Sequence, residues 1–142
     1  MGKVLVTGAN GFIGSHLVEA LIKHGYQVRA LIRKHSNLQW ISNLPIEFFY
    51  GSISNFDSIK QALDDVEYVM HVAGATKGRN FQDYMIANVE GTKNLIQLCL
   101  QHRPNLKKFI HFSTLAVTGG SDRIFDEQIK CQPISYYGIT KK

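Results

Sequence analysis

The sequence predicts an α/β fold in which helices cover both faces of a parallel, doubly wound sheet. Short apolar runs alternate with segments of helical periodicity over the whole chain, and this alternation is typical of parallel sheets. The composition, 44% apolar and 19% charged, is that of a globular protein, and 142 residues suffice for one domain. In such a fold we expect ligands at the carboxyl ends of the strands.

Five apolar runs have the length of strands. They cover residues 3–7, 27–32, 46–50, 67–73 and 108–113. The first run is short and mostly apolar, which predicts a strand buried on both faces of the sheet. No apolar run reaches the 18 residues that a membrane-spanning helix needs, so we expect no membrane partner.

Segments of helical periodicity connect these strands. Predicted helices cover residues 11–24, 37–44 and 84–101, and two more begin near residues 54 and 135. The first is closed by Gly25, and the segment from Ser54 to Asp57 resembles a capping box. In the helix over 84–101 we expect an inward face made of Val89, Leu95, Ile96 and Cys99.

The net charge of +5 comes entirely from the second half of the chain. Residues 1–71 hold six Lys/Arg and six Asp/Glu, whereas residues 72–142 hold ten and five. These basic residues are scattered along the sequence, which argues against a nucleic-acid partner and favours an ordinary solvated surface.

Cysteine and histidine spacing gives no sign of a metal site. Cys99 and Cys131 form no CxxC pair, and the six histidines show no HExxH or similar spacing. We expect His71 to pack in the core. Cysteine usage of this kind, and a Gly-rich stretch that leaves no room for a signal peptide, predict a cytoplasmic protein.

A glycine-rich turn lies where the first strand becomes the first helix. Gly8, Gly11 and Gly14 have the spacing GxxGxxG. Such glycines allow a tight turn and let backbone approach a pyrophosphate at a helix N-terminus. We expect a dinucleotide to contact Gly8, Asn10, Gly11, Phe12, Ile13 and Gly14. The alternative is a tight strand-to-helix turn without a ligand.

Five motifs occur along the chain in a recognisable order. They are TGANGFIG at 7–14, HVAG at 71–74, NVEGT at 88–92, FST followed by VTG within 112–119, and YGITK at 137–141. With these motifs the chain resembles the N-terminal part of the extended short-chain dehydrogenase/reductase family, also called the NAD-dependent epimerase/dehydratase family. The segment RALIR at 29–33 is more similar to the dihydroflavonol reductase and hydroxysteroid dehydrogenase branch than to the sugar epimerases.

The resemblance implies a Rossmann domain over residues 1–142 that binds NAD(P). Family members carry further strands and a C-terminal substrate portion, so the resemblance implies a domain incomplete at its C-terminus. It implies reversible hydride transfer to a small-molecule ketone or aldehyde. It also implies that the full-length protein forms a homodimer through the helix beginning near residue 135.

The end of the second strand favours NADP over NAD. NAD-binding folds usually place an acidic residue there, but this sequence has none between Glu19 and Glu47. Arg33 and Lys34 instead offer positive charge for a 2′-phosphate. The alternative is a pair of solvated loop charges.

Other cofactor contacts follow from the resemblance. The family pattern has an Asp for the adenine amino group where this chain has Ser52, followed by Ile53, so that contact is expected to be weaker. Backbone at Val72, Ala73 and Gly74 is expected beside the cofactor ribose. Asn88 either contacts the cofactor site or bridges backbone near the fourth strand.

Tyr137 and Lys141 form the expected reacting pair. The spacing YxxxK puts both side chains on one helix face, and the ammonium lowers the pKa of the phenol. The resemblance makes Thr114 the residue that orients a substrate oxygen, with Ser113 as its neighbour at the cofactor, and it lets Lys141 and Tyr137 contact the nicotinamide ribose. The alternative for Tyr137 and Lys141 is an exposed pair at a helix start. The alternative for Ser113 and Thr114 is a pair of hydroxyls at a strand end that only hydrogen-bond to backbone groups.

Three hypotheses follow for function. The first is an NADP-dependent oxidoreductase, present as its cofactor-binding part. The second is an NAD-dependent sugar-nucleotide epimerase or dehydratase. The third is a dinucleotide-binding fragment without turnover, because a helix with no sequence after residue 142 is expected not to form and would leave Tyr137 and Lys141 poorly fixed.

Overall fold

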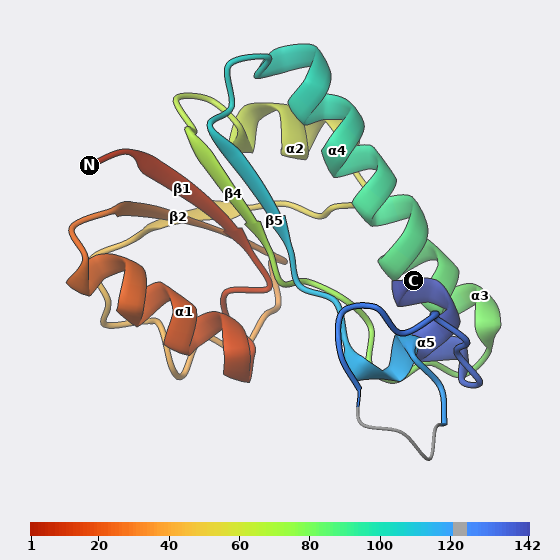
Figure 1. Cartoon of the computed structure of the whole chain (residues 1–142). Coiled ribbons are helices and arrows are strands. Elements are labelled where there is room, and N and C mark those ends of the chain that lie inside the picture. Colours follow the sequence, from red (N-terminus) through yellow and green to blue (C-terminus); the bar gives the residue numbers. More distant parts are fainter. Residues whose placement is uncertain (121–124) are drawn as a thin grey trace.

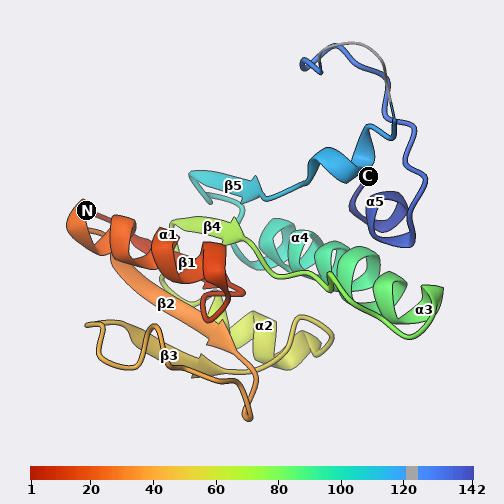
Figure 2. The ribbon, with the colours of Figure 1, turned by 90° about the horizontal axis from the view of Figure 1, so that it is seen from below.

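The fold is a five-stranded parallel sheet with helices on both faces, as predicted (Figures 1 and 2). The computed structural model describes residues 1–120 and 125–142. The strand order is β3-β2-β1-β4-β5. The strands are β1 (Lys3–Thr7), β2 (Gln27–Ile32), β3 (Glu47–Tyr50), β4 (Tyr68–His71) and β5 (Lys108–His111). The chain winds outward from β1 to β3 and then crosses to β4, which places the switch point between β1 and β4.

Seven helical segments connect or follow the strands among the described residues. They are α1 (Phe12–Lys23), α2 (Phe56–Ala62), α3 (Phe81–Tyr84), the π-helix η1 (Met85–Glu90), α4 (Gly91–His102), the 3₁₀ helix η2 (Leu115–Val117) and α5 (Tyr136–Lys141). Helix α1 covers one face of the sheet, and α2 and α4 cover the other (Figures 1 and 2).

The core is divided by the central strand β1. Val4 and Val6 face α1 and pack with Val18 and Leu21 of that helix. Leu5 faces the opposite side, in the cluster formed with α2 and α4. Because β1 is covered on both faces, four of its five residues are buried, which confirms the predicted buried strand.

One predicted helix is absent, and another begins one residue later than predicted. Residues 37–44 form turns in which the Leu38 carbonyl accepts from Ile41 N and Ser42 N, and the Asn37 side chain accepts from Gln39 N. That local side-chain bond competes with helix formation. Helix α2 begins one residue later than predicted, because Asn55 rather than Ser54 caps it by accepting from Ser58 N.

The long helix expected over 84–101 is broken into three segments, α3, η1 and α4. Leu95 and Cys99 are buried as expected, but Ile96 is 41% exposed and Leu98 takes a core position instead. Leu95, Leu98 and Cys99 have the spacing i, i+3 and i+4 and form one face of α4, whereas Ile96 follows Leu95 directly and is turned away from that face. The predicted inward position of Ile96 is therefore wrong.

The expectation that the last helix does not form is also wrong. Helix α5 spans Tyr136–Lys141, and the Ser135 side chain caps it by accepting from Gly138 N at 3.0 Å. Thr140 accepts a hydrogen bond from Asn88, and the Ser113 hydroxyl donates to the Lys141 carbonyl. Tertiary contacts of this kind stabilise a helix that is too short to form alone.

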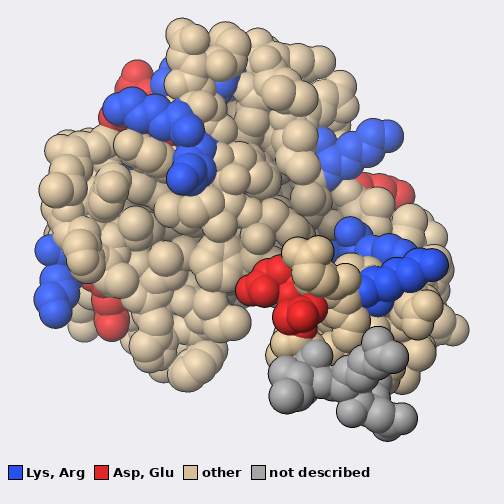
Figure 3. All heavy atoms as spheres, in the orientation of Figure 1, with Lys and Arg blue, Asp and Glu red and all other residues tan. Residues whose placement is uncertain are grey.

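Strands β4 and β5 end two residues earlier than predicted, at His71 and His111. The backbone beyond β4 turns to line a cleft instead of continuing the ladder. In the described residues, no helix combines the length and apolar character needed to cross a bilayer. Lys and Arg side chains lie in separate groups over the face shown in Figure 3, with Asp and Glu between them.

Candidate functional site

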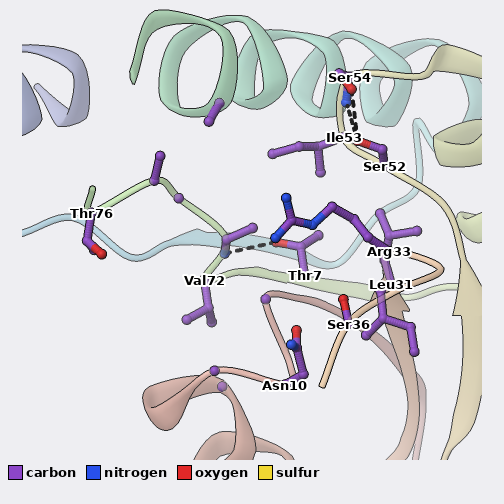
Figure 4. A pocket seen from close by; sticks show the side chains of 18 of the residues that line it. Thr7, Asn10, Leu31, Arg33, Ser36, Ser52, Ile53, Ser54, Val72 and Thr76 are labelled. Atoms are coloured by element: carbon purple, nitrogen blue, oxygen red, sulfur yellow. Dashed lines mark hydrogen bonds between the residues drawn. The ribbon is translucent and has the colours of Figure 1, made fainter. Parts of the chain in front are cut away.

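A cleft of about 850 Å³ lies at the carboxyl ends of β1, β2, β3 and β4 (Figure 4). This is the edge of the sheet at which the fold predicts a ligand. Twelve of the predicted cofactor residues line the cleft: Gly8, Asn10, Gly11, Phe12, Ile13, Gly14, Arg33, Ser52, Ile53, Val72, Ala73 and Gly74. Six predicted site residues do not line it: Lys34, Asn88, Ser113, Thr114, Tyr137 and Lys141.

The floor of the cleft is the glycine-rich turn between β1 and α1. Gly8 has a φ of +71°, and a Cβ there would lie 2.7 Å from Ala73 N of the neighbouring strand end. A Cβ at Gly14 would overlap the carbonyl of Gly8. That carbonyl accepts from Gly11 N at 3.1 Å, which closes the turn. Side chains at these two positions would collide with backbone, so only glycine lets the turn take this tight course.

The N-terminus of α1 opens into the cleft. Gly11 is its N-cap, and among the described residues no side chain caps the helix. The first N–H groups of a helix have no partner within it and carry partial positive charge, so the start of this 12-residue helix suits a phosphate group. Asn10 donates from its side chain to the Asn37 carbonyl at 3.2 Å, which ties the turn to the segment after β2.

The charge in the cleft is positive. Arg33 and Lys77 line it, and none of its described lining residues is acidic. The Arg33 side chain reaches from the end of β2 into the cleft (Figure 4). Lys34 lines a smaller hollow of about 370 Å³ together with Arg33, His35 and Ser36. The two predicted phosphate-binding cations therefore lie on two adjoining cavities that share Arg33.

A serine cluster forms the wall that follows β3. The Ser52 and Ser54 hydroxyls lie 2.8 Å apart, and Ser52 N donates to the Ser58 hydroxyl at 3.1 Å. Ser54 also lines the cleft and was not among the predicted site residues. The signal that could have found it is its place in the short segment that follows a strand of the parallel sheet.

The wall that follows β4 extends further than predicted. Besides Val72, Ala73 and Gly74 it includes Ala75, Thr76 and Lys77, and η1 adds Ile86 and Ala87. No sequence pattern marks these five residues as cleft residues, because it is the course of the chain after β4 that brings them to the cleft. Thr7 at the end of β1 was also missed, and its hydroxyl accepts from Ala73 N at 3.2 Å.

A buried imidazole connects the cleft floor to η1 and α4. His71 is fully buried, as expected, with Nδ1 2.7 Å from the Thr7 hydroxyl and Nε2 2.8 Å from the Thr92 hydroxyl. The Thr92 hydroxyl donates to the Asn88 carbonyl, so it accepts from Nε2, and Nδ1 accepts from Thr7. The network thus assigns the proton to Nε2. Burial, aided by the nearby His111 and Lys141, lowers the pKa of His71 to about 3.

Asn88 bridges three elements from within η1. Its Oδ1 accepts from Ala75 N at 2.7 Å, and its Nδ2 donates to the Ala75 carbonyl and to the Thr140 hydroxyl. This is the backbone bridge beyond β4 that the sequence suggested as one role for Asn88. The same side chain also joins that loop to α5.

Lys141 is buried at the edge of the cleft. Its Nζ lies 3.3 Å from Nε2 of His111, and a Cβ at Gly74 would lie 3.7 Å from the same Nζ. Burial lowers the pKa of Lys141. His111 was not among the predicted site residues, although a histidine inside the apolar run of a strand that ends at the ligand edge is a usable signal.

The remaining predicted catalytic residues lie on the segments after β5. Tyr137 is half-buried in the first turn of α5. The Thr114 hydroxyl accepts from Ala116 N and caps η2, and the Ser113 hydroxyl lies 3.4 Å from the Lys141 carbonyl. The structure thus brings Lys141 together with Gly74, beside Asn88, whereas no hydrogen bond between described residues joins Thr114 to Tyr137. No group of three or more potential metal ligands occurs among the described residues.

Comparison with known proteins places this geometry in a family. Residues 4–142 match the model of the NAD dependent epimerase/dehydratase family. Curated relatives include sterol demethylase protein B of Methylococcus capsulatus, 36% identical over 81% of this chain and 35% of the relative. A putative dihydroflavonol 4-reductase of Synechocystis is 33% identical over 80% and 33%. A 3-beta-hydroxysteroid dehydrogenase of Mycolicibacterium neoaurum is 32% identical over 86% and 35%.

Solved structures give the same result. The UDP-glucuronic acid 4-epimerase of Bacillus cereus, solved with NAD, matches with a TM-score of 0.83 and 35% identity over 98% of this chain and 48% of that one. The chain spans about a third of the curated relatives it matches and about half of this structure. The expected family resemblance and the Rossmann-type sheet are confirmed: the chain belongs to the NAD dependent epimerase/dehydratase family.

Proposed function

We propose that this chain is the cofactor-binding part of an NADP-dependent oxidoreductase that reversibly reduces a small-molecule ketone or aldehyde. The observation that carries the proposal is Arg33, which points into a cleft whose described lining has no acidic residue. An NAD-binding site usually places a carboxylate on the ribose 2′-hydroxyl at this strand end, whereas an arginine suits a 2′-phosphate.

The cleft fits a dinucleotide in shape and in charge. The pyrophosphate would be held by backbone of the glycine-rich turn, whose close contacts require Gly8 and Gly14, and by the N-terminus of α1, which no described side chain caps. Arg33 and Lys34 hold the 2′-phosphate, and the Ser52 hydroxyl accepts from the adenine amino group. The bound nicotinamide supplies or accepts the hydride.

The acid–base groups are assigned to the segments after β5. Tyr137 gives a proton to the substrate oxygen, and Thr114 orients that oxygen by donating a hydrogen bond. The Lys141 ammonium would donate to the nicotinamide ribose, in keeping with its place beside Gly74. These roles rest on the family pattern at the matching residues and on the buried position of Lys141.

The test is a pair of cofactor titrations. Trp40 is the only tryptophan of the chain and lies edge-on to Phe12, which lines the cleft, so its fluorescence reports ligand binding there. We expect NADPH to bind more tightly than NADH. Arg33→Ala should weaken NADPH binding about 10- to 100-fold, the loss of charge-assisted hydrogen bonds, and leave NADH binding unchanged.

Arg79→Ala is the matched control for the titrations. Arg79 is exposed and pairs with Asp83, and it does not line the cleft. Its substitution should change neither affinity. A clear preference for NADH in the unmodified chain, or an Arg33→Ala variant with full NADPH affinity, would contradict the NADP assignment.

A second candidate is an NAD-dependent epimerase or dehydratase acting on sugar nucleotides. The observation that favours it is the structural match to an epimerase solved with NAD. Under this assignment NADH binds at least as tightly as NADPH, and Arg33→Ala changes the affinities for the two cofactors by the same factor. The same titrations therefore separate the two candidates.

A further inference from the structure

Lys141 has a single hydrogen-bond partner for its ammonium among the described residues, and that partner is not a carboxylate. Its Nζ lies 3.3 Å from Nε2 of His111, and no described Asp or Glu forms a salt bridge with it. The side chain is nevertheless buried, with 6% of Lys141 exposed. A buried cation of this kind depends on the acceptor it does have.

The donor and acceptor roles in this contact follow from the chemistry of the two groups. An ammonium has three donors and no acceptor, so Nε2 of His111 must offer its lone pair. The imidazole is then neutral, with its proton on Nδ1. That atom is buried and has no partner among the described residues. The imidazole thus accepts the bond to Lys141 while its own donor is left unsatisfied.

The surroundings keep His111 neutral. Two ionisable groups face it: Lys141 from α5, and His71 from β4 with ring centroids 5.2 Å apart. On the far side of His71, η1 and α4 contribute Asn88 and Thr92, which do not ionise. Burial and the charge of Lys141 both lower the pKa of His111.

We propose that His111 is a positioning residue for Lys141, whose ammonium it holds beside Gly74 by accepting a hydrogen bond through Nε2. Because a Cβ at Gly74 would be 3.7 Å from Nζ, the ammonium so held lies at the cleft edge, where the backbone between β4 and η1 passes. The inference rests on the proposed function, in which Lys141 donates to the cofactor ribose.

With His111 in this role, cofactor binding should be sensitive to acid. A proton on Nε2 removes the lone pair that Lys141 uses and puts a second positive charge next to its ammonium. The ammonium is then released from Gly74. Cofactor affinity should fall at acidic pH as His111 becomes protonated, and a chain without this imidazole should lack that fall.

Two substitutions distinguish the effect of the imidazole lone pair from the effect of the ring itself. His111→Phe keeps a planar ring and removes the acceptor, whereas His111→Gln removes the ring and keeps a side-chain carbonyl acceptor. His102→Gln, on the exposed last residue of α4, is the matched control. The pKa of Lys141 is measured in the free chain by NMR with ¹³Cε-lysine, assigned through Lys141→Arg, and NADPH affinity is measured from pH 5 to 8.

We expect His111→Phe to lower the pKa of Lys141 by about one unit, a tenfold shift toward the neutral amine, because the ammonium loses its acceptor. It should also weaken NADPH binding about tenfold at neutral pH and flatten the acid fall. His111→Gln should restore both values at neutral pH and also remove the acid fall.

Equal Lys141 pKa values in the unmodified chain and in His111→Phe would overturn the proposal. Equal losses in His111→Phe and His111→Gln would also overturn it, since they would point to packing rather than to an acceptor. The NMR titration needs no cofactor. If the unmodified chain bound neither NADPH nor NADH, the proposed function would fail while this measurement still decided the role of His111.

Discussion

The glycine-rich turn and helix α5 approach the same cleft and are stabilised in different ways. The turn lies between a strand with four of its five residues buried and a 12-residue helix, and Gly8 and Gly14 are required there by close backbone contacts. Helix α5 has six residues and is fixed by side-chain hydrogen bonds from Asn88 and Ser135, with His111 accepting from its Lys141. Steric closeness thus defines the glycine-rich turn, and a polar network defines helix α5.

This difference predicts how the two regions fail. Backbone overlap in the turn disturbs β1 and α1 together, so damage there should unfold the whole domain. Loss of a hydrogen bond to α5 should release that helix and leave the sheet intact, since local opening follows the elements with few buried contacts. The predictions below test this contrast in order of decreasing effect.

Gly14→Ala should have the largest effect. Its Cβ would overlap the Gly8 carbonyl, which is backbone and has no room to move, so we expect a loss of about 3 kcal/mol in the free energy of unfolding. Urea denaturation measures it. Gly120→Ala is the control, because no described residue lies within 4 Å of the added carbon and the change should stay within about 0.5 kcal/mol. Similar midpoints for the two variants would refute the steric account of the turn.

Asn88→Ala should come next, and its effect should be local. The variant leaves the Ala75 backbone groups without their side-chain partner and removes the bond to Thr140, at an expected cost of about 2 kcal/mol. Hydrogen exchange should show lost protection in α5 and unchanged protection in β1. Asn94→Ala, which loses only a 3.4 Å bond to the Ile53 carbonyl, is the control. Loss of protection in β1 would show that the two regions are not separable.

The His71 imidazole should make folding stability depend on pH. Its pKa of about 3 in the folded chain lies below the ordinary 6.5, so between these values the unfolded chain binds more protons and stability falls with acid. The expected slope from this group is about 1.4 kcal/mol per pH unit. His111 has a lowered pKa too and adds in the same direction.

The pH measurement is best made between pH 5 and 6.5. The carboxyls of Glu47 and Glu67, whose pKa values are lowered by Arg29 and by Lys107, affect stability below their ordinary 4.5. His71→Gln should therefore reduce the slope in this range, because the unfolded chain loses a group that binds more protons than its folded counterpart. A slope that stays the same in this variant would show that His71 is not the titrating group.

Ser135→Ala should have the smallest effect. It removes the hydroxyl that accepts from Gly138 N at the start of α5, and loss of such a cap costs about 1 kcal/mol. The change should appear as faster amide exchange in α5, with the urea midpoint of the sheet preserved. Ser42→Ala, on an exposed turn, should leave both unchanged. Slower amide exchange in α5 than in β1 in any of these variants would contradict the view that α5 opens locally while the sheet stays folded.

The accuracy of the sequence predictions follows the same contrast. Arg33 was predicted from its position directly after a strand, and Ser52 and Gly74 were predicted from the family resemblance. The structure places all three on the cleft. Ile96 was assigned wrongly because two adjacent apolar residues, Leu95 and Ile96, compete for one face of the helix, and packing with α2 selects the face of Leu95, Leu98 and Cys99. The formation of α5 was missed because the hydrogen bonds that fix it to the rest of the chain come from residues 28 to 52 positions away.

The sequence by itself determined the parallel sheet, the glycine-rich turn and the ligand edge, because these depend on local periodicity and on backbone that only glycine permits. Only the tertiary structure decided that Lys141 is buried against His111, that His71 joins Thr7 to Thr92, and that α5 forms. Burial and hydrogen bonding between segments distant in sequence set these features, and neither quantity is encoded in the spacing of a motif.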